Sequence, residues 1–168
     1  MVTVKGLDSL IKRINTMQKQ LQSRIPLFLE RLAQIGVDTA SVRFKSAQYD
    51  GVNDVNVSAR MKGSNTIVIT ASGKAVLFIE FGTGITYSEE HPKASDMGAV
   101  RGGYGQGKGN QSSWGYYGEA GTNGKVIKTT DKGDLVITRG NPPARAMYEA
   151  DKAIMSQILK IAKEVFTQ

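Results

Sequence analysis

The sequence contains no cysteine among its 168 residues. This absence excludes disulfide bonds, cysteine-based zinc sites and thiol catalysis. The first residues also lack the basic segment and apolar core of a signal peptide. No run approaches the roughly 20 apolar residues that span a bilayer. We therefore predict a soluble protein without membrane contact, made to work in, or assemble from, a reducing cytoplasm.

Basic residues are scarce where a nucleic-acid-binding loop would need them. The formal net charge is +7, but its location matters more than its size. Residues 1–49 carry eight Lys or Arg against three Asp or Glu, whereas residues 85–124 carry three against four. A loop that follows a phosphate backbone should be more basic. The positive charge therefore belongs mainly to the N-terminal region.

Glycine, by contrast, is concentrated in one stretch. The segment Gly82–Gly124 holds 12 of the 19 glycines, the single Trp and the single His. No run within it has the apolar spacing of a helix or a strand. Long loops inside compact domains are uncommon and usually bind something. We interpret this stretch as a docking loop.

Helices are predicted near both ends of the chain. Apolar residues at three- and four-residue steps predict an amphipathic helix over residues 7–21. Pro26 favours a break, or the first turn of a second helix that runs to about residue 42. After Pro142 and Pro143, an apolar stripe predicts a last helix.

Five strands are predicted between these helices. Residues 55–59 alternate, residues 66–70 are β-branched throughout, and a Gly-Ser-Asn turn joins them, so they read as a hairpin. The apolar run at residues 75–81 predicts a buried central strand. Residues 125–130 and 134–138 predict a second hairpin.

The fold class follows from this order of elements. We predict an α+β fold: a mostly antiparallel sheet of about five strands, with two N-terminal helices and one C-terminal helix packed on it, plus the long loop rich in glycine and aromatic residues. Residues 1–168 form a single domain. Its parts are a helical region at 1–49, a sheet at 50–84, the docking loop at 85–124, a hairpin at 125–141 and the C-terminal helix at 142–168.

Catalytic and ligand-binding motifs are incomplete. The segment Gly102–Gly109 approaches a phosphate-binding P-loop, but Gly109 stands where Ser or Thr is needed. Glu80 is predicted to be a strand-end carboxylate bonded to backbone amides or a lysine, and His91 a surface histidine. A hydrolase built on these two residues is the weakest alternative. We therefore expect no enzyme activity, no cofactor and no metal.

The aromatic residues of the docking loop leave three interpretations open. Tyr104, Trp114, Tyr116 and Tyr117 could stack on nucleic-acid bases, anchor a protein interface, or fold back onto their own domain. Between residues 102 and 124 only Lys108 is basic. This lack of charge favours protein contact over nucleic acid.

Three segments resemble the HK97 gp10-like family of tailed-bacteriophage proteins. They are Phe78–Gly84, Ser113–Gly118 with Gly121–Gly124, and Gly140–Tyr148. The helix that opens on Gly6-Leu7-Asp8 also fits, so the resemblance covers most of the chain in consistent order.

The resemblance implies a structural virion protein that completes the tail and joins it to the head. It implies a homo-oligomeric ring at the neck, hexameric by the symmetry of the tail, assembled in the host cytoplasm. Neighbours would be tail-tube or terminator proteins and head-connector proteins, and no catalytic residues are carried over. A connector-side adaptor, rather than a tail-side ring, is an alternative station.

Four residues of the N-terminal region form a candidate basic face: Lys12, Arg13, Lys19 and Arg24. In a ring this face would meet an acidic partner or make non-specific contact with genomic DNA in the lumen. A basic nucleic-acid-binding protein is the alternative that the net charge favours.

Overall fold

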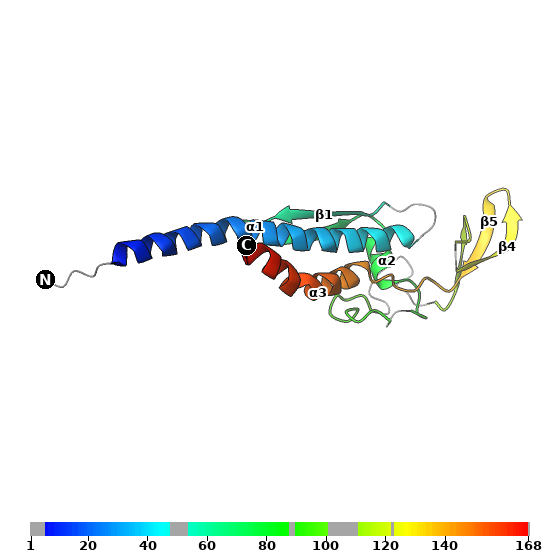
Figure 1. The fold of residues 1–168 in the computed structure, drawn as a ribbon. Coiled ribbons are helices and arrows are strands. Elements are labelled where there is room, and N and C mark those ends of the chain that lie inside the picture. The colour runs from blue at the N-terminus through cyan, green and yellow to red at the C-terminus, as the bar shows by residue number, and fades with distance from the viewer. Residues whose placement is uncertain (1–5, 48–53, 88–89, 101–110, 122, 168) are drawn as a thin grey trace.

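The computed structural model describes residues 6–47, 54–87, 90–100, 111–121 and 123–167. Within these residues the α+β class is confirmed (Figure 1). The elements in chain order are α1 (Leu7–Ser46), β1 (Asn56–Met61), β2 (Ile67–Ser72), α2 (Val76–Phe81), β3 (Trp114–Tyr117), β4 (Gly124–Thr130), β5 (Gly133–Thr138) and α3 (Ala146–Phe166).

The N-terminal region is one continuous helix, so the prediction of two helices was wrong. α1 runs for 40 residues with Pro26 inside it. A proline in a helix interior costs about 3 kcal/mol, and packing against α3 offsets this cost. The Phe28 and Phe166 rings lie 5.5 Å apart, and Arg24 donates a hydrogen bond of 3.1 Å to the Phe166 carbonyl.

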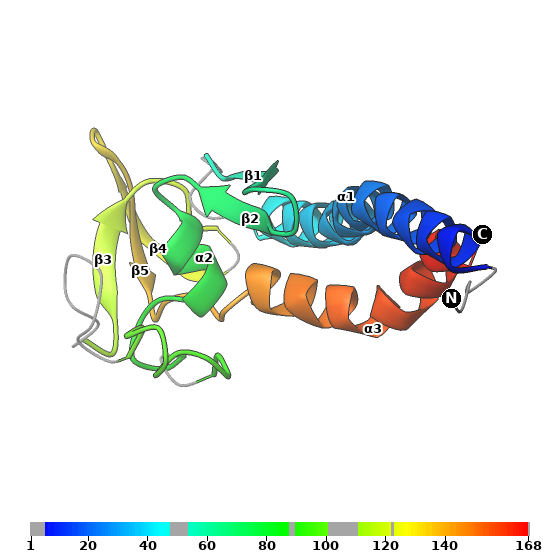
Figure 2. The ribbon, with the colours of Figure 1, turned by 90° about the vertical axis from the view of Figure 1, so that its left-hand side faces the viewer.

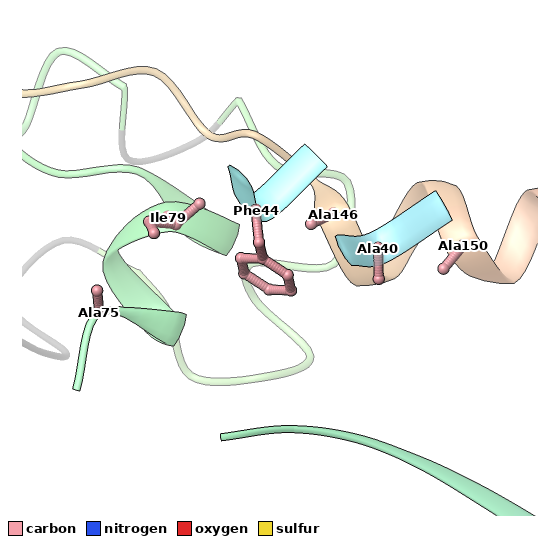
Figure 3. Close-up of a cluster of buried hydrophobic side chains, with 6 residues drawn as sticks. All are labelled: Ala40, Phe44, Ala75, Ile79, Ala146 and Ala150. Carbon is pink, nitrogen blue, oxygen red and sulfur yellow. The ribbon is translucent and has the colours of Figure 1, made fainter. Parts of the chain in front are cut away.

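The helix pair α1–α3 forms the body of the molecule. α3 runs antiparallel beside the C-terminal half of α1 (Figures 1 and 2). Leu32, Ile161 and Val165 are buried near the C-terminal end of α3. At the other end, Ala40, Phe44, Ala146 and Ala150 pack with Ala75 and Ile79 around α2 (Figure 3).

A glycine allows α1 to be packed from two sides. A Cβ added at Gly36 would lie 2.6 Å from Ile69 Cδ1 and 2.7 Å from Ile154 Cδ1. Ile69 belongs to β2 and Ile154 to α3, so the β1–β2 hairpin and α3 both contact α1 at this point. The small residue lets the two neighbours approach the same turn.

Strands β1 to β5 form two separate antiparallel sheets, whereas a single sheet was predicted. β1 pairs with β2 from Asn56↔Ser72 to Met61↔Ile67. The other sheet has the order β3-β5-β4. Both predicted hairpins and the last helix are confirmed, but no strand among the described residues joins the hairpins. The three-stranded sheet lies at the end of the molecule remote from the start of α1 (Figure 1).

The missing central strand is a short helix. The apolar run at residues 75–81 forms α2, with Ala75 and Ile79 buried four residues apart while Leu77 is 52 % exposed. Burial at a four-residue step is that of a helix face, not of a strand buried on both sides. A short apolar run does not distinguish the two by its pattern alone.

Candidate interaction surfaces

Two segments far apart in the sequence meet in what we call the backbone crossing, residues 79–84 against residues 139–145. Thr83 donates its N–H to the Asn141 carbonyl at 2.9 Å, and the Asn141 N–H returns to Thr83 Oγ1 at 2.9 Å. Ala144 donates to the Ile79 carbonyl at 2.8 Å. These bonds fix the start of α3 against the end of α2.

Glycines make this crossing close. A Cβ added at Gly82 would lie 2.6 Å from the Asn141 carbonyl oxygen, and one added at Gly140 would lie 1.9 Å from that of Thr83. Both residues have positive φ, 78° and 101°, which glycine adopts without steric cost. The Phe-Gly-Thr-Gly and Gly-Asn-Pro-Pro motifs therefore serve backbone packing.

Glu80 caps α3 from outside that helix. Its carboxylate accepts hydrogen bonds from the Met147 N–H at 2.8 Å and the Tyr148 N–H at 3.1 Å. Arg145, the N-cap residue, makes no side-chain cap bond of its own. The predicted bonding of Glu80 to backbone amides is confirmed, although Glu80 lies in a helix. A carboxylate at a helix N-terminus also interacts favourably with the helix dipole.

His91 is buried, so its prediction as a surface residue was wrong. Its side chain is 2 % exposed, and Nε2 lies 3.1 Å from Glu80 Oε1. Lys93 donates its N–H to Nδ1 at 3.0 Å. Nδ1 is therefore the unprotonated nitrogen, and Nε2 carries the proton that it donates to Glu80. The contact is a hydrogen bond of a neutral imidazole rather than an ion pair.

The Glu80–His91 pair brings together the two residues of the enzyme alternative. Both imidazole nitrogens are occupied, one by Lys93 and one by Glu80, and both Glu80 oxygens accept backbone N–H groups. General acid–base catalysis needs one such atom within reach of a substrate proton. Within the described residues, no group of three or more His, Asp or Glu is placed to hold a metal ion. The arrangement fits a structural pair.

The predicted docking loop is folded over part of its length. Ala94 and Ala99 are buried with Phe81, so residues 90–100 pack on the end of α2. Trp114–Tyr117 form β3, which pairs with β5. The prediction that this stretch contains no strand was wrong. Residues 101–110 lie outside the described residues, and Tyr104 is among them.

The described aromatic candidates do not form one cluster. Trp114 is half-buried, and its ring lies against Gly84, where an added Cβ would be 3.1 Å from Trp114 Cζ3. Tyr116 donates its hydroxyl to the Glu119 carbonyl at 2.8 Å. Tyr117 is 52 % exposed. Trp114 therefore folds back onto its own domain. For Tyr117, the anchoring of a protein partner remains a prediction.

Tyr117 belongs to an exposed face of the three-stranded sheet, which we call the outer sheet face. Pairing places Tyr117, Leu135 and Lys128 side by side in one row, and Gly115, Ile137 and Lys125 in the next row on the same face. Ile137 is 42 % exposed. The opposite face carries Trp114, Tyr116 and the buried Val136. The exposed Tyr117 and Ile137, with the half-buried Leu135, thus form an apolar strip flanked by two lysines.

A second exposed surface lies at the other end of the molecule. Residues 7–21 of α1, here called the overhang, extend past the C-terminal end of α3 (Figure 1). Its large apolar side chains are between 47 and 60 % exposed. They are Leu7, Leu10, Ile11, Ile14, Met17 and Leu21. This stripe has the spacing of a buried helix face but no covering among the described residues.

The four residues of the candidate basic face do not share one surface. Lys12 and Lys19 lie seven residues apart and point the same way, whereas Arg13 lies about 100° round the helix from Lys12. Arg24 is half-buried at the end of α3, where it bonds to Phe166. Its position next to α3 gives it a structural role. DNA contact by the other three remains a prediction.

Asp54 gives a pH-dependent contribution to stability. Hydrogen bonds from the Lys74 and Ala75 N–H groups lower the pKa of its carboxyl below 3.8. Because the pKa of Asp54 is lower in the folded state than in the unfolded state, the ionised carboxylate stabilises the fold above the unfolded-state pKa. This stabilisation is lost as the pH falls through the folded-state pKa. We expect the stability difference between wild type and Asp54→Asn to be largest at neutral pH and to shrink below pH 3.8. Urea unfolding across this range tests it, with Asp131→Asn as the control; a difference independent of pH would contradict it.

Comparison of the chain with protein-family models, curated proteins and solved structures found no match in any of the three. In the described part of the chain, none of the helices combines the length and apolar character needed to cross a membrane.

Proposed function

We propose that this chain is a structural virion protein of a tailed bacteriophage, which completes the tail and joins it to the head. In this proposal it assembles as a homo-oligomeric ring at the neck, hexameric to match the tail, and carries no catalytic site. The resemblance of residues 78–84, 113–118 with 121–124, and 140–148 to the HK97 gp10-like family motivates the proposal. The station is the tail side of the junction, with a connector-side adaptor as the variant.

The observation that carries the proposal is the placement of two exposed apolar surfaces at opposite ends of an elongated chain. The overhang lies at one end, and the outer sheet face lies at the other (Figure 1). Contiguous exposed apolar surface is typical of interaction sites. A subunit that joins two assemblies needs separate surfaces for its own copies and for its neighbours.

The outer sheet face is suited to a protein neighbour. Tyr117 offers a large, partly apolar ring of the kind enriched at the centres of interfaces. Lys125 and Lys128 lie on the same face and would favour a partner with acidic groups at the rim. We assign this face to docking on a neighbouring tail or connector protein.

A nucleic-acid-binding protein is the second candidate function. The observation that favours it is the exposure of Lys12, Arg13 and Lys19 on a projecting helix. Salt-dependent DNA affinity of the purified protein would support it, and no binding at low salt would exclude it. In the neck proposal the same residues would touch DNA without sequence preference.

The docking role predicts the effect of Tyr117→Glu combined with Ile137→Glu. Loss of a central anchor typically costs 2 kcal/mol or more of binding, so we expect infectious particles to fall by more than about tenfold. Because both side chains are exposed, the free protein should remain folded. The measurement is the yield of infectious phage after complementation, with electron microscopy of unjoined heads and tails.

The matched control is Leu159→Glu, since Leu159 is 77 % exposed on α3, away from the sheet. An unchanged phage yield with the double variant would contradict the docking role. A deletion of residues 102–121 would also remove β3, so it would not separate the docking role of the loop from the loss of a strand.

A further inference from the structure

The overhang continues an interface that already exists within the chain. Leu7, Ile14, Leu21, Phe28 and Ile35 follow one another at seven-residue steps on α1. The last two pack against the C-terminal end of α3, in the cluster of Leu32, Ile161 and Val165. The first three lie beyond that end and are exposed. One apolar stripe is thus covered by a helix over part of its length and uncovered over the rest.

The spacing of the uncovered part is that of a helix–helix seam. Leu7, Leu10, Ile14, Met17 and Leu21 alternate steps of three and four residues, the repeat by which two helices pack side by side. The overhang is an extension of a helix anchored by α3, so its helical form does not depend on pairing. Pairing therefore does not have to supply the free energy for helix nucleation.

The charges on the overhang are compatible with a second copy of the same segment. Lys12 and Lys19 lie on the side of α1 opposite the stripe, as helical geometry requires. The stripe is flanked mainly by Asn15, Gln18 and Gln20, with Arg13 as the charged exception. Neutral flanks neither demand an acidic partner nor drive identical copies apart.

We propose that the overhang pairs with the overhang of a second copy of this chain, in antiparallel orientation. The end of α3 decides the orientation, because it occupies the stripe from about Phe28 onward. A parallel helix would run into α3, whereas an antiparallel helix begins beside the end of α3 and leaves past Leu7. The two free segments have equal length, so each covers the other.

The size of the surface sets the strength of the pair. A 15-residue overhang is about 22 Å long, and its stripe is smaller than the roughly 800 Å² per partner of a standard interface. We therefore expect reversible pairing with a dissociation constant on the order of 10 μM. The inference goes beyond the proposed function and does not rest on it. An antiparallel pair has two-fold symmetry and closes as a dimer, so the contacts between neighbouring subunits of a ring would use other surfaces.

Sedimentation velocity of the full chain over a range of concentrations tests the pairing. We expect a monomer–dimer equilibrium that Ile14→Gln with Leu21→Gln weakens by at least about tenfold. The matched control is Val42→Gln, an exposed aliphatic residue on the covered half of α1, which should leave the equilibrium unchanged. A monomer at every concentration, or a dimer that ignores the double variant, overturns the proposal.

Cross-linking tests the orientation, and the absence of cysteine makes it specific to introduced positions. In the antiparallel pair, Leu7 of one copy lies near Leu21 of the other, while the two Leu7 residues are about 20 Å apart. A short bismaleimide should therefore join Leu7→Cys to Leu21→Cys in a mixture and should not join Leu7→Cys to itself. Efficient self-joining of Leu7→Cys overturns the proposal.

The two proposals fail separately. A chain that is monomeric in solution but required for joining heads to tails contradicts the pair and not the neck function. A chain that pairs as described, while phage lacking it still assemble and infect, contradicts the neck function and supports the pair.

Discussion

Replacing Gly140 with alanine is expected to lower the free energy of unfolding by more than about 4 kcal/mol. Losses of this size are exceptional and arise from severe disruption of packing or of the backbone. The new Cβ would lie 1.9 Å from the Thr83 carbonyl oxygen, a distance that two non-bonded atoms do not reach. Gly140 also has a φ of 101°, which costs an L-residue about 1–3 kcal/mol. The backbone crossing would have to open.

Gly133→Ala is the matched control for Gly140→Ala. Gly133 has nearly the same φ, 102°, but nothing lies within 4 Å of an added Cβ. Its substitution should cost only the backbone strain, about 1–3 kcal/mol. For a chain of this length, each 1 kcal/mol lowers the melting temperature by about 2–4 °C. Thermal unfolding should therefore rank the variants clearly, and equal melting temperatures would show that the crossing is not as close as described.

Glu80→Ala is the second large effect that we expect. The substitution leaves the Met147 and Tyr148 N–H groups at the start of α3 without a partner, and likewise the buried Nε2–H of His91. Each buried donor left unpaired costs about 1–3 kcal/mol. We expect a loss of roughly 3–5 kcal/mol in the free energy of unfolding, measured by urea denaturation.

Two further variants separate capping from the loss of one carboxylate. Glu80→Gln should also destabilise, because all three partners of Glu80 are donors and an amide replaces one acceptor by another donor. Glu164→Ala removes a carboxylate that is 38 % exposed and paired with Arg31, so it should cost no more than about 1 kcal/mol. Hydrogen exchange at Met147 and Tyr148 should accelerate in the Glu80 variants and not in Glu164→Ala. Unchanged exchange there would contradict the capping role.

Local patterns predicted the elements whose form depends on their own residues. The β-branched run at residues 66–70 and the turn at residues 131–133 produce the two hairpins. The apolar stripe after Pro142 and Pro143 produces α3. In each case the period of the side chains and the turn residues agree with the final structure.

The incorrect predictions concern elements whose form depends on contacts with residues far away in the sequence. Pro26 favours a break, but Phe28 and Arg24 hold α1 against a residue about 140 positions later. Residues 76–81 form a helix whose end meets the start of α3, and Glu80 accepts a hydrogen bond from Met147 across 67 positions. No local pattern contains these pairings. A lone histidine within a polar stretch gave equally little sign that it would be buried.

The candidate surfaces were predicted unevenly for the same reason. The stripe at residues 7–21 was recognised as apolar, but its exposure depends on where α3 ends. Tyr117 and Trp114 were chosen together, yet strand alternation places them on opposite faces of a sheet that the sequence did not predict to include them. The signal available in the sequence was the aromatic content of Trp114–Tyr117, because strands favour aromatic residues.

Pro26 has a further consequence for the mechanics of α1. Because proline has no N–H, the carbonyl of Gln22 lacks its partner four residues on. That missing bond lies at the root of the overhang, at the level where α3 ends. We therefore expect α1 to bend more readily at this turn than elsewhere along its length. If copies of the chain pair through the overhang as proposed, bending at this turn would let them change their mutual angle without repacking the core.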